Sequence, residues 1–358
     1  MLISFENIKP NKPEPIPIDI DLIGLNRRME LQRAVNAILD GEYILIKDYY
    51  STGLSLLEAI KKHLNSKYND LDFLGQRDFR AIYRAASQRL LVRVQNQQLT
   101  IRKAPFIGWL KYFYSEYPDF LLSFPDIQGL NSSWQWYEKG IKIPEIKHRI
   151  HPFYGTYFPT RFEHLKLFAN WLKTYSNAKK SAIDIGVGCG VLSFLLIENG
   201  FEKVYATDIN KNAILSVSEE LKRINLVDKI YLFCGDLFEG IDIKSELILF
   251  NPPWLPSKGN NTVLDKAIYY EEDLFTKFFE QAYQHLEKNG KIVIVFSNLA
   301  QKVGFCSLHP IAQELAQGGR FKKDILLKKN VNEASKKTKR NQTWRKEEFV
   351  ELWVLSAI

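Results

Sequence analysis

The 358-residue chain contains only three cysteines, Cys189, Cys234 and Cys306, and no C-x-x-C pair. This odd, scattered set argues against a disulfide scaffold and a cysteine-rich zinc site, and it fits a reducing compartment such as the cytoplasm. The six histidines show no metal-ligand spacing, so we expect no bound metal. The chain has no run of about 18 apolar residues, which predicts no membrane span. Its first twenty residues contain acids and prolines, unlike a secretory signal.

What the chain does contain is enough apolar sequence for a large core. Hydrophobic residues make up 46% of it and charged residues 25%, so disorder is not expected. The length suggests two domains, because one domain usually takes about 100–200 residues. The net charge of +8 is modest: it permits an anionic partner without requiring one.

The first 148 residues predict a smaller α+β domain that helps to select the substrate. Four prolines between Pro10 and Pro17 indicate an extended arm, and helical patterns follow at about 27–39 and 53–66. Alternating residues on both sides of Gln95–Gln98 predict a hairpin. The basic stretch Arg80–Lys111, which contains no acid, is a candidate nucleic-acid surface; its arginines could equally pair with acids elsewhere.

Residues 149–358 predict a Rossmann-like α/β domain with a seven-stranded sheet. Thr160 and Glu163 have the spacing of a capping box that opens a helix. Helices are also expected after a glycine turn at 186–190, at about 211–223 and at about 271–287. The alternation predicts a parallel sheet covered on both faces, and the last two strands are expected to form an antiparallel hairpin. The seven strands are predicted at about 181–185, 203–207, 229–234, 246–250, 291–296, 321–328 and 348–356.

A glycine-rich turn follows the strand at 181–185. The segment Asp184-Ile185-Gly186-Val187-Gly188-Cys189-Gly190 has the spacing D-x-G-x-G-x-G, and glycines let a backbone turn sharply close to a ligand. Asp208 ends the next strand, where a carboxylate can accept both hydroxyls of a ribose. Asp236 follows the third strand and is placed to read an adenine edge. These signals predict a nucleoside-containing ligand at the carboxyl edge of the sheet.

Two details limit other interpretations of this turn. The dinucleotide fingerprint G-x-G-x-x-G would need a third glycine where this chain has Val191, which disfavours a NAD-dependent dehydrogenase. Cys189 has no histidine or other base nearby in the sequence, so we interpret it as a packing residue and not as a nucleophile.

The strand at 246–250 is followed by Asn251-Pro252-Pro253-Trp254. Two prolines stiffen this turn and remove two backbone donors. The side-chain oxygen of Asn251 and the carbonyl of Pro252 remain as acceptors, which suits a planar –NH2 group. Trp254 could stack on a flat amide or base. The turn therefore predicts a site that positions a nitrogen for methylation.

With these motifs, residues 151–358 resemble a class I S-adenosylmethionine-dependent methyltransferase of the N-P-P-[FYW] branch. That branch methylates exocyclic amines of adenine or guanine in nucleic acids, and glutamine side chains in release factors and a ribosomal protein. The segment Gly155–Glu163 resembles the P-R-x-E region of the glutamine enzymes, with Thr160 inserted between proline and arginine. A non-catalytic module that keeps the fold is a further alternative.

The resemblance implies a role for each motif residue. Gly186, Gly188 and Gly190 would line the methionine part of S-adenosylmethionine, Asp208 would take the ribose hydroxyls and Asp236 the adenine amino group. Asn251, Pro252 and Trp254 would hold the target nitrogen. The predicted cofactor site consists of Asp184, Gly186, Gly188, Gly190, Asp208, Asp236 and Asn251, and the predicted catalytic turn of Asn251, Pro252, Pro253 and Trp254.

The substrate stays open at this stage between nucleic acid, with RNA favoured, and protein glutamine. The segment Phe321–Glu347 contains ten Lys or Arg and three acids, a net charge of +7 (10 − 3), and it includes Trp344. A basic loop of this kind could clamp a phosphate backbone, although charge runs are usually solvated surface. The two basic segments favour nucleic acid, while the Pro159, Arg161 and Glu163 pattern favours a protein.

Overall fold

The computed structural model describes residues 8–68, 73–257, 268–306, 308–331 and 347–358. The chain divides into two compact units, one formed by Asn11–Glu138 and one by Met1–Pro10 with Lys139–Ile358. This division lies near the boundary expected at residues 148/149. The assignment of 1–148 and 149–358 as separate domains, and of substrate selection to the first, remains a prediction.

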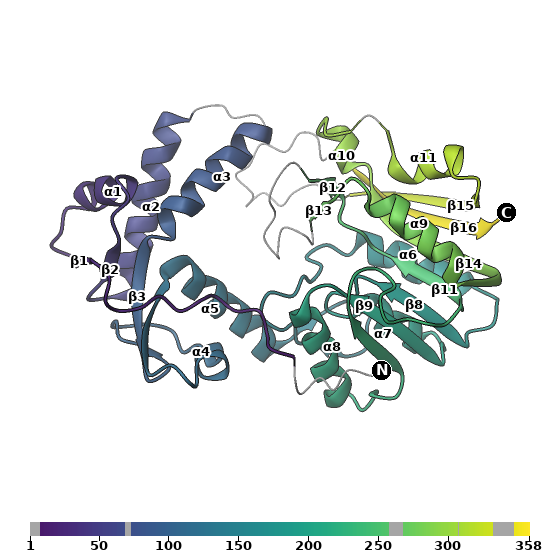
Figure 1. The fold of residues 1–358 in the computed structure, drawn as a ribbon, viewed down its shortest axis with the longest axis horizontal. Helices are drawn as coiled ribbons and strands as arrows, with labels where there is room; N and C mark the ends of the chain where they lie inside the picture. The colour runs from purple at the N-terminus through teal and green to yellow at the C-terminus, as the bar shows by residue number, and fades with distance from the viewer. Residues whose placement is uncertain (1–7, 69–72, 258–267, 307, 332–346) are drawn as a thin grey trace. The chain divides into compact units, whose positions relative to one another are not determined.

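The C-terminal unit is built around a seven-stranded sheet with the order β10-β9-β8-β11-β14-β16-β15 (Figure 1). All neighbouring strands are parallel except β16, which is antiparallel to both β14 and β15. The predicted parallel sheet and terminal hairpin are therefore confirmed. The strands are β8 (Ser181–Ile185), β9 (Lys203–Asp208), β10 (Ile230–Cys234), β11 (Ser245–Phe250), β14 (Leu286–Ser297), β15 (Phe321–Asn330) and β16 (Phe349–Ala357).

Two apolar cores cover the two faces of this sheet. Side chains that alternate along a strand point to opposite faces, and in β14 Val293 and Val295 belong to one core while Ile292 and Ile294 belong to the other. Such a strand is apolar throughout because both faces are buried. The first core includes α6 (Glu163–Thr174), α7 (Val191–Glu198) and α8 (Lys211–Arg223), and the second includes α9 (Leu274–His285) and α11 (Pro310–Gln317).

The capping box expected at Thr160 and Glu163 is wrong. Helix α6 begins at Glu163 itself, its N-cap is Phe162, and no side chain caps it. A capping box needs the glutamate at the third helical position, whereas Glu163 occupies the first. Thr160 therefore lies too far before the helix to reach its free N–H groups.

Several short elements of this unit were not predicted from the sequence. They are β6 (Ile141–Lys142), β7 (Arg149–Ile150), β12 (Leu255–Pro256), β13 (Tyr269–Tyr270) and α10 (Leu299–Lys302). Two predicted elements differ in length: helix α9 is shorter than 271–287, and β14 is longer than 291–296.

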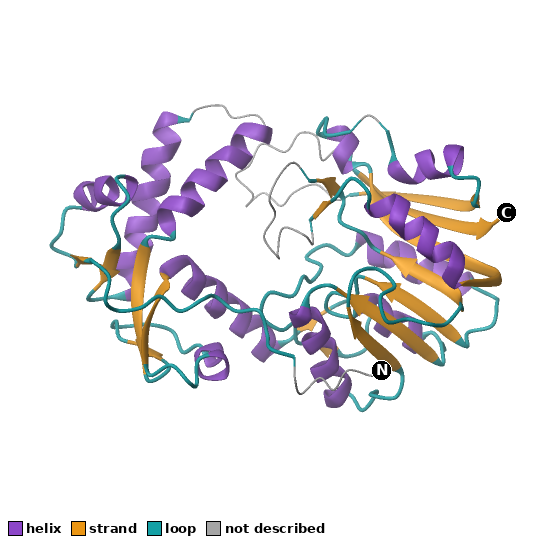
Figure 2. Cartoon of the chain, in the orientation of Figure 1, coloured by secondary structure: helices purple, strands orange, loops and turns teal. Residues whose placement is uncertain are grey.

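The N-terminal unit contains a five-stranded mixed sheet (Figure 2). Strands β1, β2 and β3 are parallel, while β4 and β5 each pair antiparallel with β3. The α+β prediction for this part agrees with that architecture. Its elements are β1 (Ile23–Leu25), α1 (Leu31–Leu39), β2 (Ile44–Ile46), α2 (Tyr50–Lys67), α3 (Phe73–Ser87), β3 (Leu90–Gln95), β4 (Gln98–Leu99), α4 (Gly108–Phe113), β5 (Asp119–Ser123) and α5 (Phe124–Lys139).

The predicted hairpin in this unit is present as β3 and β4. Its two-residue turn consists of Asn96 and Gln97, both with positive φ, 50° and 58°. This conformation matches the twist of the paired strands. Arg93 on β3 forms an ion pair with Asp119 on β5, so this arginine of the basic stretch is neutralised within its own sheet.

The apolar segments of the chain are distributed among these cores. Among the residues that the structure describes, no helix has both the length and the apolar character needed to cross a bilayer.

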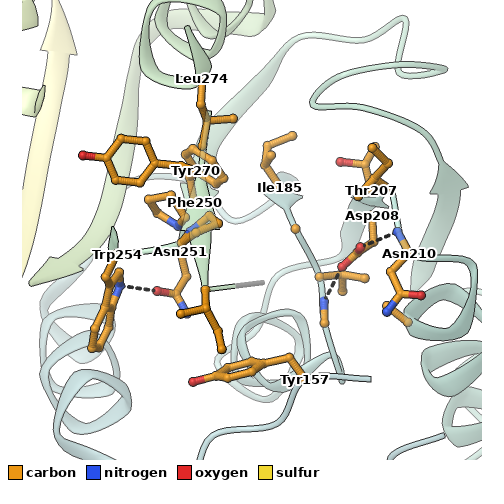
Figure 3. A pocket seen from close by; sticks show the side chains of 18 of the residues that line it. Tyr157, Ile185, Thr207, Asp208, Asn210, Phe250, Asn251, Trp254, Tyr270 and Leu274 are labelled. Carbon is orange, nitrogen blue, oxygen red and sulfur yellow. Dashed lines mark hydrogen bonds between the residues drawn. The ribbon is translucent and has the colours of Figure 1, made fainter. Parts of the chain in front are cut away.

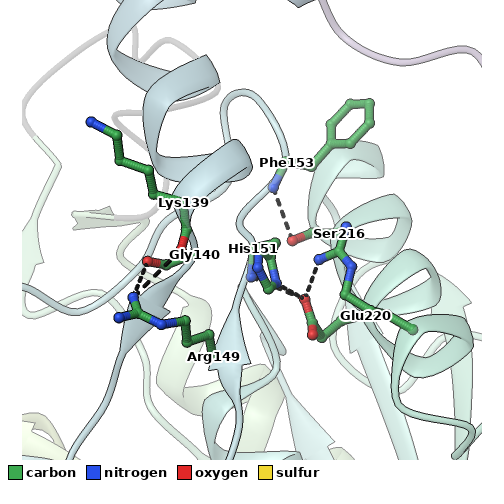
Figure 4. A network of polar contacts seen from close by, with 8 residues as sticks. Lys139, Gly140, Arg149, His151, Phe153, Ser216 and Glu220 are labelled. Carbon is green, nitrogen blue, oxygen red and sulfur yellow. Dashed lines mark hydrogen bonds and ion pairs between the residues drawn. The ribbon is translucent and has the colours of Figure 1, made fainter.

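A buried carboxylate joins α8 to the segment that leads into the C-terminal sheet (Figure 4). Glu220 is 1% exposed and accepts hydrogen bonds from the backbone N–H of His151, 3.0 Å, and from Arg223, 2.9 Å. Its carboxylate also lies 3.0 Å from Nδ1 of His151, and Ser216 of the same helix accepts from the N–H of Phe153, 3.1 Å. These bonds fix the strand β7 and the chain after it against α8.

We expect Glu220→Ala to lower the free energy of unfolding by about 3 kcal/mol, because the change removes one partner of a buried charge network. Urea unfolding followed by tryptophan fluorescence measures the loss. The control is Asp228→Ala, an exposed acid near the end of the same helix, for which a change of less than about 0.5 kcal/mol is expected. Equal effects of the two substitutions would show that the network does not hold this segment.

Candidate functional site

The site lies at the carboxyl ends of β8, β9 and β11, which the parallel pairing brings to one edge of the sheet. A cavity of about 500 Å³ opens there, lined by the loops that follow these strands and by parts of α6 and α9. Ligands of open α/β sheets bind at this edge, because the loops after neighbouring strands converge on it.

The glycine turn after β8 forms one wall of the cavity. Gly186 and Gly188 line it and have positive φ angles of 72° and 53°. A Cβ on Gly186 would meet no atom within 4 Å, so the missing side chain leaves open space for a ligand. Gly190 does not line the cavity. A Cβ there would lie 2.7 Å from the ring of Phe194, so this glycine is required for packing.

Asp208, the last residue of β9, is held by two backbone donors (Figure 3). Its Oδ2 accepts from the N–H of Gly188, 2.9 Å, and its Oδ1 accepts from the N–H of Asn210, 2.8 Å. The carboxylate lines the cavity, and each oxygen keeps a further lone pair for a hydroxyl group. Burial raises the pKa of Asp208 to about 6, so the group is ionised at neutral pH.

Asp184 does not line the cavity, contrary to its predicted place in the cofactor site. It is 1% exposed, and its Oδ2 accepts from the hydroxyl of Ser193 on α7, 2.6 Å. Burial raises the pKa of Asp184 to about 7. The carboxyl group therefore lies behind the turn, where it ties β8 to α7.

Asp236 lines the cavity after β10, and its backbone N–H donates to Glu239, 3.0 Å. Its side chain is exposed. This position agrees with the predicted one, and the contact with an adenine edge remains a prediction.

The turn Asn251-Pro252-Pro253-Trp254 after β11 forms the opposite side of the cavity from Asp208 (Figure 3). The indole N–H of Trp254 donates to Oδ1 of Asn251, 3.2 Å. This bond orients the amide of Asn251 and shows which of its ends is the acceptor. The sequence did not predict this bond.

His164 on α6 is a further cavity residue, which was not predicted from the sequence. It lines the cavity, and its ring meets Trp254 edge to face, with 5.7 Å between ring centroids and 90° between ring planes. Burial lowers the pKa of His164 to about 4, so the imidazole is neutral at neutral pH. A single histidine on an amphipathic helix gave no signal by which to find it.

Cys189 lies in the glycine turn and is 3% exposed. Burial raises the pKa of its thiol to about 12, so it is protonated and unsuited to nucleophilic attack. In the described part of the chain, no group of three or more His, Cys, Asp or Glu is arranged to hold a metal ion.

Comparison with known families identifies the domain that carries this site. Residues 165–305 match the family described as the methyltransferase small domain. The C-terminal unit contains a methyltransferase domain. The matched range includes the glycine turn, Asp208, Asp236 and the Asn251–Trp254 turn, and it confirms the predicted family and enzyme class.

Three relatives of this chain are named as protein methyltransferases. A protein of Methanocaldococcus jannaschii, assigned by its name to the protein N5-glutamine methyltransferases, is 29% identical over 51% of this chain and 92% of its own length. The release factor glutamine methyltransferase of Aquifex aeolicus is 28% identical over 34% of this chain. The ribosomal protein L11 methyltransferase of Carboxydothermus hydrogenoformans is 31% identical over 40%. The chain spans about half the length of these last two relatives, 47% and 44%.

Among solved structures, the ribosomal protein L11 methylase of Lactobacillus delbrueckii subsp. bulgaricus has a TM-score of 0.41 and 20% identity, over 58% of this chain and 84% of its own. At this level of similarity the comparison carries no weight for function.

The cofactor of the methyltransferase domain is S-adenosylmethionine, as predicted. The residues present fit it: Asp208 offers acceptors for a pair of hydroxyls, and the open space beside Gly186 allows close approach of a chain. Asp208, Asp236, Gly186 and Gly188 would hold it, and it would supply a methyl group bonded to a sulfonium sulfur. The role of each single residue in this binding remains a prediction.

We expect the affinity for S-adenosylmethionine to fall as the pH drops below about 6. The pKa of Asp208 is raised to about 6 by burial, and protonation below that pH removes a charged acceptor from the hydroxyl site. Isothermal titration calorimetry between pH 5 and 8 measures this dependence. Asp208→Asn should bind more weakly, by about tenfold, and lose the pH dependence. If Asp208→Asn kept the same pH profile, another group would be responsible.

Proposed function

We propose that this protein transfers a methyl group to the side-chain amide nitrogen of a protein glutamine. The observation that carries the proposal is the Asn251–Trp254 turn on the cavity wall, where the amide oxygen of Asn251 is oriented by the indole of Trp254. Two acceptors on a stiff turn match the two hydrogens of one planar –NH2 group.

The residues of the turn would act by positioning. Oδ1 of Asn251 and the carbonyl of Pro252 would each accept one hydrogen of the target –NH2, which draws its nitrogen away from the plane and exposes a lone pair. The turn would hold that nitrogen in line with the methyl group that bound S-adenosylmethionine would supply, and the nitrogen would release one proton to solvent after transfer. Most of the rate enhancement would come from alignment.

The neutral state of His164 fits this arrangement. Its pKa of about 4 leaves the imidazole uncharged at neutral pH, so His164 adds no positive charge beside Trp254 that would repel the developing charge on the nitrogen. The edge-to-face contact would also hold the indole in place for the bond to Asn251.

A protein substrate is favoured by the protein N5-glutamine methyltransferase relative, which aligns along 92% of its own length, and two of the basic residues are neutralised by carboxylates. Arg93 is paired with Asp119, and Lys328 on β15 with Glu351, 3.3 Å. Of the segment Phe321–Glu347, residues 332–346 lie outside the described residues, and Phe321–Asn330 forms a strand and not a loop. The clamp expected from this segment therefore remains a prediction.

An exocyclic base amine in RNA is the second candidate. It is favoured by the net charge of +8 and by exposed arginines of the N-terminal unit. The same turn would serve it, since a base amine is also a planar –NH2 group.

We expect Asn251→Ala to lower the rate of methyl transfer by about 10²–10³-fold, the usual loss for one preorganised hydrogen-bonding group in an active site. The dissociation constant for S-adenosylmethionine should stay within about twofold, because the turn holds mainly the acceptor. Single-turnover transfer and calorimetric binding provide the two measurements. The matched control is Asn170→Ala, an exposed asparagine on α6. Retained turnover in Asn251→Ala would refute this active site.

The substrate class is tested by label transfer from tritiated S-adenosylmethionine to an extract of cells that lack this protein. We expect precipitable label that protease removes and ribonuclease leaves, with N5-methylglutamine found after digestion of the labelled band. Loss of the label with ribonuclease alone would show the RNA amine to be the substrate instead.

A further inference from the structure

The N-terminal unit carries a cluster of cations around one tyrosine, outside the methyltransferase domain. Three segments meet there: the chain after β1, the chain between β2 and α2, and the chain after β4. Within Asn26–Arg28, Lys47–Ser51 and Thr100–Lys103 the sequence has five basic residues and one acid, Asp48. We call this set the Tyr49 cluster; its basic residues are Arg27, Arg28, Lys47, Arg102 and Lys103.

Backbone bonds hold the three segments together. Arg102 donates its N–H to the carbonyl of Asp48, 2.7 Å, and accepts from the N–H of Tyr50, 3.0 Å. Lys47 donates to the carbonyl of Leu25, 2.9 Å. The cluster therefore rests on the ends of the strands β1 and β2 and the start of α2, and not on a single loop.

Tyr49 lies between two of the cations. The guanidinium of Arg27 lies over its ring, 3.7 Å from the centroid, and that of Arg102 lies 5.8 Å from it. A hydrogen bond from Arg102 and the charges of Arg102, Arg27 and Lys103 lower the pKa of the Tyr49 phenol. The aromatic ring holds like charges together that would otherwise repel one another.

No carboxylate of the described residues forms an ion pair with the side chains of Arg27, Arg28, Arg102 or Lys103, and all four are exposed. Asp48 is nearby, but its oxygens accept from the N–H groups of Arg27 and Tyr49 and from the hydroxyl of Thr52. Arg93, in the same unit, shows the contrast, because Asp119 neutralises it. Five cations beside the single carboxylate of Asp48 leave an excess of positive charge, which forms a site for anions.

An exposed aromatic side chain follows the cluster along the chain. Phe106 comes three residues after Lys103, so at most about 11 Å of extended chain separates them. It is 75% exposed and meets Trp134 edge to face, with 6.2 Å between centroids. Cations for phosphates beside an open ring for a base form the pattern by which proteins bind single-stranded nucleic acid.

We propose that the Tyr49 cluster is a binding site for the phosphates of single-stranded RNA, with Phe106 as a stacking platform. The inference goes beyond the proposed function and does not depend on it, since it concerns the N-terminal unit alone. The RNA bound there would be either the substrate itself or part of a ribonucleoprotein whose protein component is methylated.

The test uses the full-length protein and a fluorescein-labelled single-stranded RNA of 12 nucleotides, with anisotropy measured from 50 to 300 mM KCl. In the double variant Arg27→Ala/Arg102→Ala we expect about tenfold weaker binding at 100 mM. The slope of log affinity against log salt should fall by about 1.4, since each lost single-strand phosphate contact contributes about 0.7. Phe106→Ala should weaken binding without changing the slope.

The matched control is Arg33→Ala/Lys61→Ala, which removes two exposed charges from α1 and α2 of the same unit. It should bind RNA within twofold of the unchanged protein. Equal weakening in both double variants would overturn the proposal, because it would show a general charge effect. Absence of RNA binding in the unchanged protein would overturn it too.

A competition experiment distinguishes RNA from a small phosphate-containing anion as the ligand of this site. If inorganic phosphate or a nucleoside monophosphate displaces the RNA at micromolar concentration, the site takes a small anion and the RNA assignment fails. Binding of S-adenosylmethionine, measured in every variant, serves as the folding control. Label transfer to protein with no RNA binding would leave the proposed function standing and remove this inference alone.

Discussion

The Asp208 carboxylate, with its two backbone donors, is the constraint on which the methyltransferase site depends. One donor belongs to the glycine turn after β8 and the other to the loop after β9, so a single side chain sets the distance between the two loops. The turn can meet the carboxylate because Gly186 and Gly188 adopt positive φ. The burial that comes with this geometry raises the pKa of the carboxyl group.

The parallel sheet places the Asn251–Trp254 turn at the same edge as Asp208. β11 lies beside β8, so the loop after β11 reaches the same edge as the glycine turn, and Asn251 faces the cavity from the side opposite Asp208. Apolar residues on both faces of the central strands bury the sheet between two helical layers and leave only its ends open. The position of the cavity at this edge thus follows from the strand order and from the burial of both faces of the sheet.

Most of the C-terminal fold could be predicted because short apolar runs alternate with amphipathic segments. Strand β8 and helix α8 begin and end where the sequence predicted. Asp184 was misplaced for a local reason: residues alternate along a strand, and the side of β8 that carries Asp184 faces Ser193 of α7. β1 and β2 are three residues each and exist through pairing with distant strands, which no local pattern reveals. His164 and the Tyr49 cluster depend equally on contacts between segments far apart in the sequence.

The bond between Trp254 and Asn251 holds the side chains of the turn together with no ligand bound. The Asn251 oxygen that we propose as the acceptor of a substrate hydrogen already accepts one from the indole, 3.2 Å away. The turn is thus preorganised without a ligand, and little rearrangement would be needed when a substrate binds. A ligand that donates only one hydrogen bond to the turn, or none, gains little binding free energy beyond the bond that the indole already makes. The indole of Trp254 would therefore favour substrates whose hydrogen bonds to the turn are stronger than its own bond to Asn251.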